Sequence, residues 1–216
     1  IRILLAFLLT WMIYPLTDWP LIDPTSAEGL KAVFYQVFVG VLMGILLQIV
    51  NAALIIGGQA VSASMGLSMA NMVDPSMGNV PVIAQFFVIC STLIFLGLGG
   101  HVLVISLLLE SFELLPINSA LDLQGLLKLT IEWSAMMFVG AILIGLPLMA
   151  SLLFINIGLG VITRTAPALN IFAVGFPAMI LAGIVLLSLS MTSIGYRIQW
   201  LWQESFEIIG QALGIR

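Results

Sequence analysis

The chain has 216 residues, of which 62% are hydrophobic and 7% are charged, and its formal net charge is −4. Soluble domains carry about 25% charged residues, so this composition excludes an ordinary water-soluble domain. It indicates a chain that lies in lipid, inside a membrane-bound assembly, or in both. The few charges form no acidic or basic run, so we expect no nucleic-acid partner. The single cysteine, Cys90, rules out an internal disulfide.

Several long segments contain no Asp, Glu, Lys or Arg: residues 32–73, 75–109, 133–163 and 165–196. Each exceeds the roughly 20 apolar residues that a helix needs to cross a bilayer core. We therefore predict an all-α, membrane-associated bundle of long helices that forms a single domain over residues 1–216. The segment Ile3–Leu16 is too short to span a membrane alone, and we interpret it as the end of a truncated N-terminal helix.

The remaining helices are expected between short polar breaks. The second should begin at Ser26 and run to about Ile56. The third should cover Val82–Leu115. Because about 50 Å of helix is more than one bilayer core requires, it must tilt, bend at its glycines or extend beyond the membrane. The bending glycines are Gly97, Gly99 and Gly100. The last three segments are expected at Leu126–Gly158 with a kink at Pro147, at Leu169–Ile194, and as an amphipathic end at Tyr196–Leu213.

The stretch Gly57–Pro81 is unusual, because it is rich in Gly, Ser, Asn and Met and contains one charged residue, Asp74. Such a composition disfavours a stable isolated helix. Irregular backbone at membrane depth persists only where protein buries it or where it lines a cavity. Met65, Met69 and Met72 fall at helical spacing, so a short core-packed helix is one interpretation. An adaptable plug across a pore is the other, since methionine is unbranched and flexible.

Catalytic and metal-binding patterns are missing from the sequence. The only histidine, His101, and the only cysteine cannot assemble a zinc or iron site, and no nucleotide-binding or hydrolase motif occurs. We therefore expect no enzyme, no metal and no cofactor. For His101, a neutral hydrogen-bonded residue beside the glycine bend is favoured over a proton relay. A small-molecule or ion-coupled transporter, with broken helices at 57–81 and 163–170 forming its site, is the alternative function.

Two motifs resemble the FliR family of flagellar biosynthetic proteins. The first is GGQAVSASMGLSMANMVDPSMG, beginning at Gly57, and the second is TRTAPALNIFAVGFP at 163–177. The second motif is matched by Arg164, Pro167, Asn170, Phe172, Gly175, Phe176 and Pro177. Together with their spacing, these motifs extend the resemblance over essentially the whole chain.

The resemblance implies a core subunit of the flagellar type III protein export gate in the bacterial inner membrane, at the flagellar basal body. It further implies FliP and FliQ as partners, FlhB at the cytoplasmic side, and unfolded export substrates as cargo. The implied fold is a set of bent helical hairpins with a glycine- and methionine-rich plug loop over Gly57–Pro81. The plug and gating residues would be Gly57, Gly58, Gln59, Met65, Gly66, Met69, Met72, Asp74 and Pro75. Arg164 is either a solvated helix-end charge or the ion partner of another chain.

Overall fold

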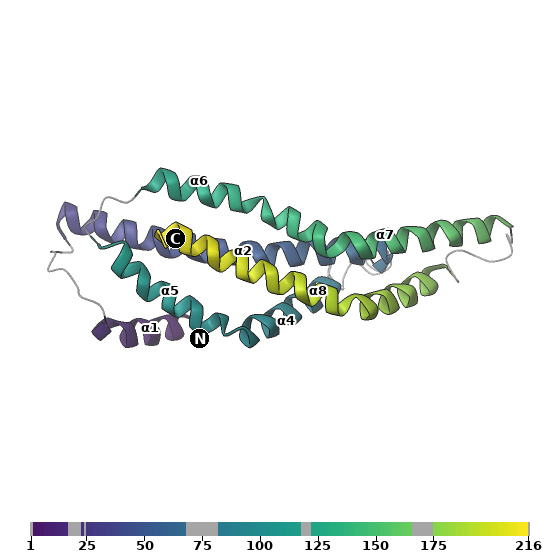
Figure 1. Cartoon of the computed structure of the whole chain (residues 1–216), viewed down its shortest axis with the longest axis horizontal. Helices are drawn as coiled ribbons and strands as arrows, with labels where there is room; N and C mark the ends of the chain where they lie inside the picture. Colours follow the sequence, from purple (N-terminus) through teal and green to yellow (C-terminus); the bar gives the residue numbers. More distant parts are fainter. Residues whose placement is uncertain are drawn as a thin grey trace.

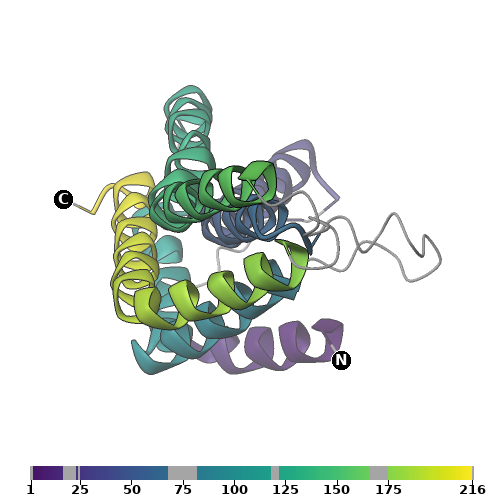
Figure 2. The same cartoon turned by 90° about the vertical axis from the view of Figure 1, so that its right-hand side faces the viewer.

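A computed structural model describes residues 2–16, 23, 25–67, 82–117, 122–165 and 175–215, and within these ranges all regular structure is helical. The prediction of an all-α fold is confirmed. The helices form an elongated bundle (Figure 1), and Figure 2 shows it from one end. In chain order they are α1 (Arg2–Ile13), the 3-10 helix η1 (Tyr14–Leu16), α2 (Ala27–Ser64), α4 (Val82–Gly97), α5 (Gly100–Leu114), α6 (Leu123–Ser134), α7 (Met136–Thr165) and α8 (Phe176–Leu213).

The described helices are suited to a membrane. Three units are long and apolar enough to cross a bilayer, namely α2, the α6–α7 pair and α8. A fourth span is possible if the bent pair α4–α5 counts as one. The expectation of a membrane-associated helical bundle is therefore confirmed.

Helix α2 lies at the centre of the bundle and packs against α4, α6, α7 and α8 (Figure 1). It begins where predicted, since the Gly29 N–H donates a 3.0 Å hydrogen bond to Ser26 Oγ and so caps the helix. Its middle turns bury Leu46, Val50 and Ala53 almost completely. Burial of this face against four neighbours is the main contribution to the hydrophobic core.

The predicted end of this helix at Ile56 is wrong, because α2 continues to Ser64 and includes the first turns of the expected loop. The reason is close packing at two glycines. A Cβ on Gly57 would lie 3.1 Å from the Ala141 carbonyl oxygen of α7, and one on Gly58 would lie 2.4 Å from Ala84 Cα of α4. Without side chains here, neighbouring helices approach closely enough to offset the poor helix propensity of glycine.

Of the three alternatives for the third segment, the structure shows the bend at the glycines. Helices α4 and α5 meet at 66°, and Gly99 between them has a φ of +70°, which a residue with a Cβ adopts only with strain. The next residue is also constrained, because a Cβ on Gly100 would lie 2.5 Å from the Phe95 ring. The bend thus turns the chain sharply within an otherwise apolar segment.

The fourth segment differs from the prediction in where it begins and breaks. It starts at Leu123, because Asp122 Oδ1 accepts a 3.0 Å hydrogen bond from the Gly125 N–H. The interruption falls at Ala135, between α6 and α7, whereas Pro147 lies inside α7 and the helix continues through it to Thr165. Burial of Ile144 and Leu148 on either side of the proline stabilises the helix despite the lost hydrogen bond.

The last two predicted segments form one helix, α8, so the expected division near Tyr196 is wrong. Buried side chains recur every three or four residues through this region, which keeps one stripe of the helix facing the bundle. These residues are Ile194, Ile198, Leu201, Ser205 and Ile209. Contacts of α8 with α2 and α4 therefore stabilise the apolar and amphipathic halves as one continuous helix.

Two buried tryptophans supply polar links across the interior. The Trp202 indole N–H of α8 donates a 2.9 Å hydrogen bond to Ser91 Oγ of α4. The Trp133 indole N–H of α6 donates a 3.2 Å bond to the Leu46 carbonyl of α2, which also accepts from Ser205 at 3.4 Å. Among the described residues, no buried side-chain polar atom lacks a partner. Pairing of this kind is required in an apolar interior, where unsatisfied polar groups are costly.

Candidate functional site

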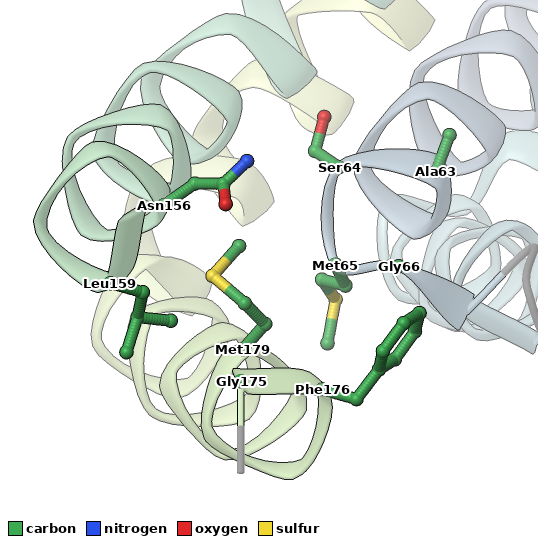
Figure 3. Close-up of a pocket in the computed structure, with 9 residues that line it drawn as sticks. All are labelled: Ala63, Ser64, Met65, Gly66, Asn156, Leu159, Gly175, Phe176 and Met179. Carbon is green, nitrogen blue, oxygen red and sulfur yellow. The ribbon is translucent and has the colours of Figure 1, made fainter. Parts of the chain in front are cut away.

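The two sequence motifs meet in one pocket, where the end of α2, the last third of α7 and the start of α8 converge (Figure 3). The pocket has a volume of about 300 Å³. It is lined by Ala63, Ser64, Met65 and Gly66 from the first motif, by Gly175 and Phe176 from the second, and by Asn156, Leu159 and Met179. Figure 3 shows Asn156 of α7 and Met179 of α8 facing this space from the side opposite α2.

Met65 is held in the core at the edge of this pocket. Its side chain is 1% exposed, and its backbone N–H donates to the Val61 carbonyl at 2.9 Å as α2 ends. A Cβ on Gly183 of α8 would lie 2.5 Å from Met65 Cε, so the methionine occupies the space that this glycine leaves open. Met65 therefore joins α2 to α8, whereas its predicted role in sealing a channel stays a prediction.

Gly183 is a residue that sequence reasoning did not single out. Its sequence context could have indicated a role in packing, because a small residue within an apolar helix commonly marks a close contact between helices. Nothing in the local sequence indicates that its partner is Met65, because the two residues lie on different helices.

Gly66 forms the turn that ends α2, with a φ of +78° and its N–H donating to the Ala63 carbonyl at 3.0 Å. Its α-carbon faces Phe176 of the second motif, because a Cβ here would lie 3.0 Å from the phenyl Cε1. The backbone conformation strongly favours glycine, and a Cβ here would also force the Phe176 ring to shift. The two motifs are thus in direct contact at this pair.

The other predicted plug residues fall into two groups. Gly57 and Gly58 are buried between helices, and Gln59 is exposed on α2, so these three belong to a helix and not to a loop. Met69, Met72, Asp74 and Pro75 lie outside the described residues.

The second motif is also divided. Gly175, Phe176 and Pro177 form the start of α8, with proline in the first turn, where its missing N–H is tolerated. Arg164 is exposed in the last turn of α7, where a positive charge is favourable at a helix C-terminus. No described carboxylate pairs with it, so its alternative role as an ion partner of another chain stays a prediction. Pro167, Asn170 and Phe172 lie outside the described residues.

His101 lies on α5 directly after the glycine bend and is exposed. None of the described residues hydrogen-bonds to its imidazole, so the expected hydrogen bond is not found in this part of the chain. Within the same residues, no group of three or more His, Cys, Asp or Glu side chains could hold a metal ion.

These features define a helical membrane protein in which two glycine-containing motifs meet at one end of a long central helix. The chain belongs to the family described as bacterial export proteins, family 1, whose model matches residues 1–205. The resemblance to the FliR family is confirmed, because curated relatives with that name are similar over nearly the whole chain.

Three relatives illustrate the similarity, and each is named flagellar biosynthetic protein FliR. The chain is 32% identical to the protein of Pectobacterium carotovorum subsp. carotovorum over 99% of its own length and 82% of the relative. The chain is 32% identical to the protein of Escherichia coli (strain K12), over 99% of its own length and 82% of the relative. It is 30% identical to the protein of Aquifex aeolicus (strain VF5), over 96% of its own length and 81% of the relative. The family match favours a non-enzymatic membrane component of flagellar protein export over the alternative transporter.

Proposed function

We propose that this chain forms part of the wall and gate of the channel through which unfolded flagellar proteins are exported across the bacterial inner membrane, at the flagellar basal body. The observation that carries the proposal is the meeting of the two family motifs at Met65, Gly66 and Phe176. A gate needs a fixed support and a point at which the chain leaves that support. Met65 and Gly66 supply both, because Met65 is buried in the core and Gly66 turns the backbone immediately after α2.

The helical part of the first motif belongs to the wall in this proposal. Gly57 and Gly58 lie against the backbones of α7 and α4, which leaves little room for their helix to move. Gating is therefore assigned to the residues after Gly66, with Met69 and Met72 as the seal. A methionine seal suits cargo of varied sequence, since its flexible side chain adapts to different surfaces.

The partners proposed for this chain are FliP and FliQ, with FlhB at the cytoplasmic side. Support comes from the outer face of α2, where large apolar side chains are exposed around Gly40 and Gly44. A Cβ at either glycine would meet no atom of the chain within 4 Å. Exposed apolar surface with central small residues is typical of a face that another helix covers. The exposed side chains are Val33, Phe34, Val37, Val41 and Ile45.

Assembly is tested by co-expressing the chain with FliP and FliQ and recording native mass spectra after gentle detergent extraction. We expect one discrete complex that contains this chain and several copies of both partners. Gly44→Leu should reduce its yield, whereas Gly97→Leu at a distant open glycine should not. A monomer that retains neither partner would contradict the proposal.

Gating is tested by replacing residues 68–76 with a Gly-Ser linker of equal length, so that α2 and Gly66 stay intact. The assembled complex in planar bilayers should then show increased ion conductance. Replacing residues 118–121 in the same way is the matched control and should leave conductance unchanged. Unchanged conductance in the 68–76 variant, with the complex fully assembled, would remove the gate assignment but not the assembly.

A further inference from the structure

Helices α7 and α8 form an antiparallel hairpin. Its part between the levels of Arg197 and Arg164 matches one bilayer core in length, and the uncharged part of α7 continues beyond the level of Arg197 to Met136. Asn156 and Leu159 lie beside the start of α8, while a Cβ on Gly140 would lie within 3.2 Å of Leu201 near its other end. Residues 144–163 and 176–196 carry no Asp, Glu, Lys or Arg. At 1.5 Å per residue each segment is about 30 Å long, the thickness of a hydrocarbon core.

An arginine lies on either side of this uncharged part of the hairpin. Arg164 lies in the last turn of α7, and Arg197 follows the apolar half of α8, beside Leu143 of α7. This separation suits two charges at opposite membrane interfaces. Figure 1 shows the two helices extending together beyond the rest of the bundle. The hairpin therefore offers a complete path from one interface to the other.

A shallow groove surrounds Arg197. It has a volume of about 690 Å³ and combines one cation with three hydroxyl groups and an indole. The lining residues are Leu143 of α7 and Leu189, Thr192, Ser193, Tyr196, Arg197 and Trp200 of α8. Within the described residues, no carboxylate forms an ion pair with Arg197, so its charge is not neutralised by this part of the chain.

The groove continues into an apolar stripe on the outer face of α8. Leu181, Val185 and Leu189 follow one another at intervals of four residues and therefore lie on one side of the helix. Leu189 is 77% exposed, and the other two are also more than half exposed. Tyr196 and Trp200 flank the arginine at 69% and 39% exposure, as is typical of aromatic side chains at a membrane interface.

We infer that this groove binds an anionic phospholipid. The Arg197 guanidinium would pair with the lipid phosphate, since its planar donors match phosphate oxygens, and the Thr192 and Ser193 hydroxyls would donate further hydrogen bonds. One acyl chain would lie along the stripe from Leu189 to Leu181. A free phosphate would use only the polar end of the groove, whereas a phospholipid uses its charge and its apolar stripe together.

The experiment reconstitutes the assembled complex in nanodiscs that contain phosphatidylcholine with a minor fraction of phosphatidylglycerol. Native mass spectrometry then measures which lipid stays bound, and titration with inorganic phosphate tests the headgroup alone. We expect phosphatidylglycerol to be retained selectively, and phosphate at millimolar concentration not to displace it. Arg197→Gln should weaken retention about fivefold, the factor expected for one basic residue at an anionic surface. Arg197→Lys should weaken it less, because it keeps the charge but loses the planar donors.

Arg164→Gln is the matched control, since it removes the same charge in the last turn of α7, away from the residues that line this groove. It should leave retention unchanged. Equal retention of both lipids, an equal effect of the two glutamine variants, or displacement by phosphate alone would overturn the inference. Loss of a partner subunit from Arg197→Gln, with lipid retention unchanged, would assign the groove to a protein interface and also overturn it.

Discussion

The Trp202 indole donates its hydrogen bond to Ser91 Oγ at 2.9 Å in a site where the serine is completely buried. The same indole lies against Phe95, with ring centroids 4.6 Å apart. The bond joins α8 to α4 just before the bend between α4 and α5. Because the neighbours are apolar, neither polar group has water to replace a lost partner. This pair is therefore the strongest candidate for a polar contact that stabilises the bundle.

We predict that Trp202→Phe lowers the free energy of unfolding by about 2 kcal/mol, since it removes the donor and leaves the serine unsatisfied. Ser91→Ala should lower the free energy of unfolding by a similar amount, because it leaves the indole N–H unpaired. The double variant should lower the free energy of unfolding by less than the sum of the two single losses. Unfolding in mixed micelles with increasing denaturant measures all three. Additive costs would show that the hydrogen bond contributes nothing beyond packing.

The second prediction concerns Gly58, whose added Cβ would lie 2.4 Å from Ala84 Cα. Gly58→Ala should destabilise the fold by about 1–3 kcal/mol, because the backbone of α4 must move away from α2. Gly158→Ala is the matched control, since nothing lies within 4 Å of that position on α7. The control should be neutral or slightly stabilising, as alanine favours a helix over glycine. Equal melting temperatures for the two variants would refute close packing at Gly58.

The third prediction concerns the turn at Gly66, where φ is +78° and a Cβ would approach the Phe176 ring at 3.0 Å. Gly66→Ala should destabilise the chain by about 1–2 kcal/mol through the left-handed backbone conformation, in addition to the contact with the ring. Adding Phe176→Leu should relieve the contact but not the backbone strain. Thermal unfolding of the two variants separates these causes. If the melting temperature of the Gly66→Ala/Phe176→Leu double variant equalled that of Phe176→Leu alone, backbone strain at Gly66 would be unimportant.

The fourth prediction is a pH dependence outside the membrane-spanning helices. The Asp23 carboxylate accepts hydrogen bonds from the Thr25 N–H at 3.0 Å and from its hydroxyl at 2.7 Å, and these bonds lower the pKa of Asp23. Because the pKa is lower in the folded chain, the ionised Asp23 carboxylate stabilises the fold at every pH above its pKa in the unfolded chain. This stabilisation is lost as the pH falls through its pKa in the folded chain. The turn before α2 should therefore loosen only in strong acid.

Thr25→Val tests this, because it removes the hydroxyl and keeps the backbone donor. The pKa of Asp23 should then rise toward its ordinary value, as followed by the carboxyl carbon chemical shift in micelles. Thr10→Val on α1, whose hydroxyl donates to the Ala6 carbonyl, is the control and should leave that titration unchanged. An unaltered Asp23 titration in Thr25→Val would assign the shift to the backbone bond alone.

Local signals in the sequence were sufficient for several features. Long uncharged segments predicted the all-α membrane class, and Ser26 predicted the start of α2. The glycines after Phe95 marked where the third segment would bend, if it bent at all. The two motifs predicted the family. Each of these depends on composition or on residues close together in the chain, so no knowledge of distant contacts was needed.

Other features were decided only by tertiary structure. Gly57–Ser64 is helical because α4 and α7 pack directly on its glycines, and α8 continues past Tyr196 because one buried stripe faces α2 and α4. The pairing of Met65 with Gly183, and the meeting of the two motifs, join residues on separate helices. Such contacts override weak local preferences, because burying closely packed apolar surface stabilises a helix more than a glycine within it costs.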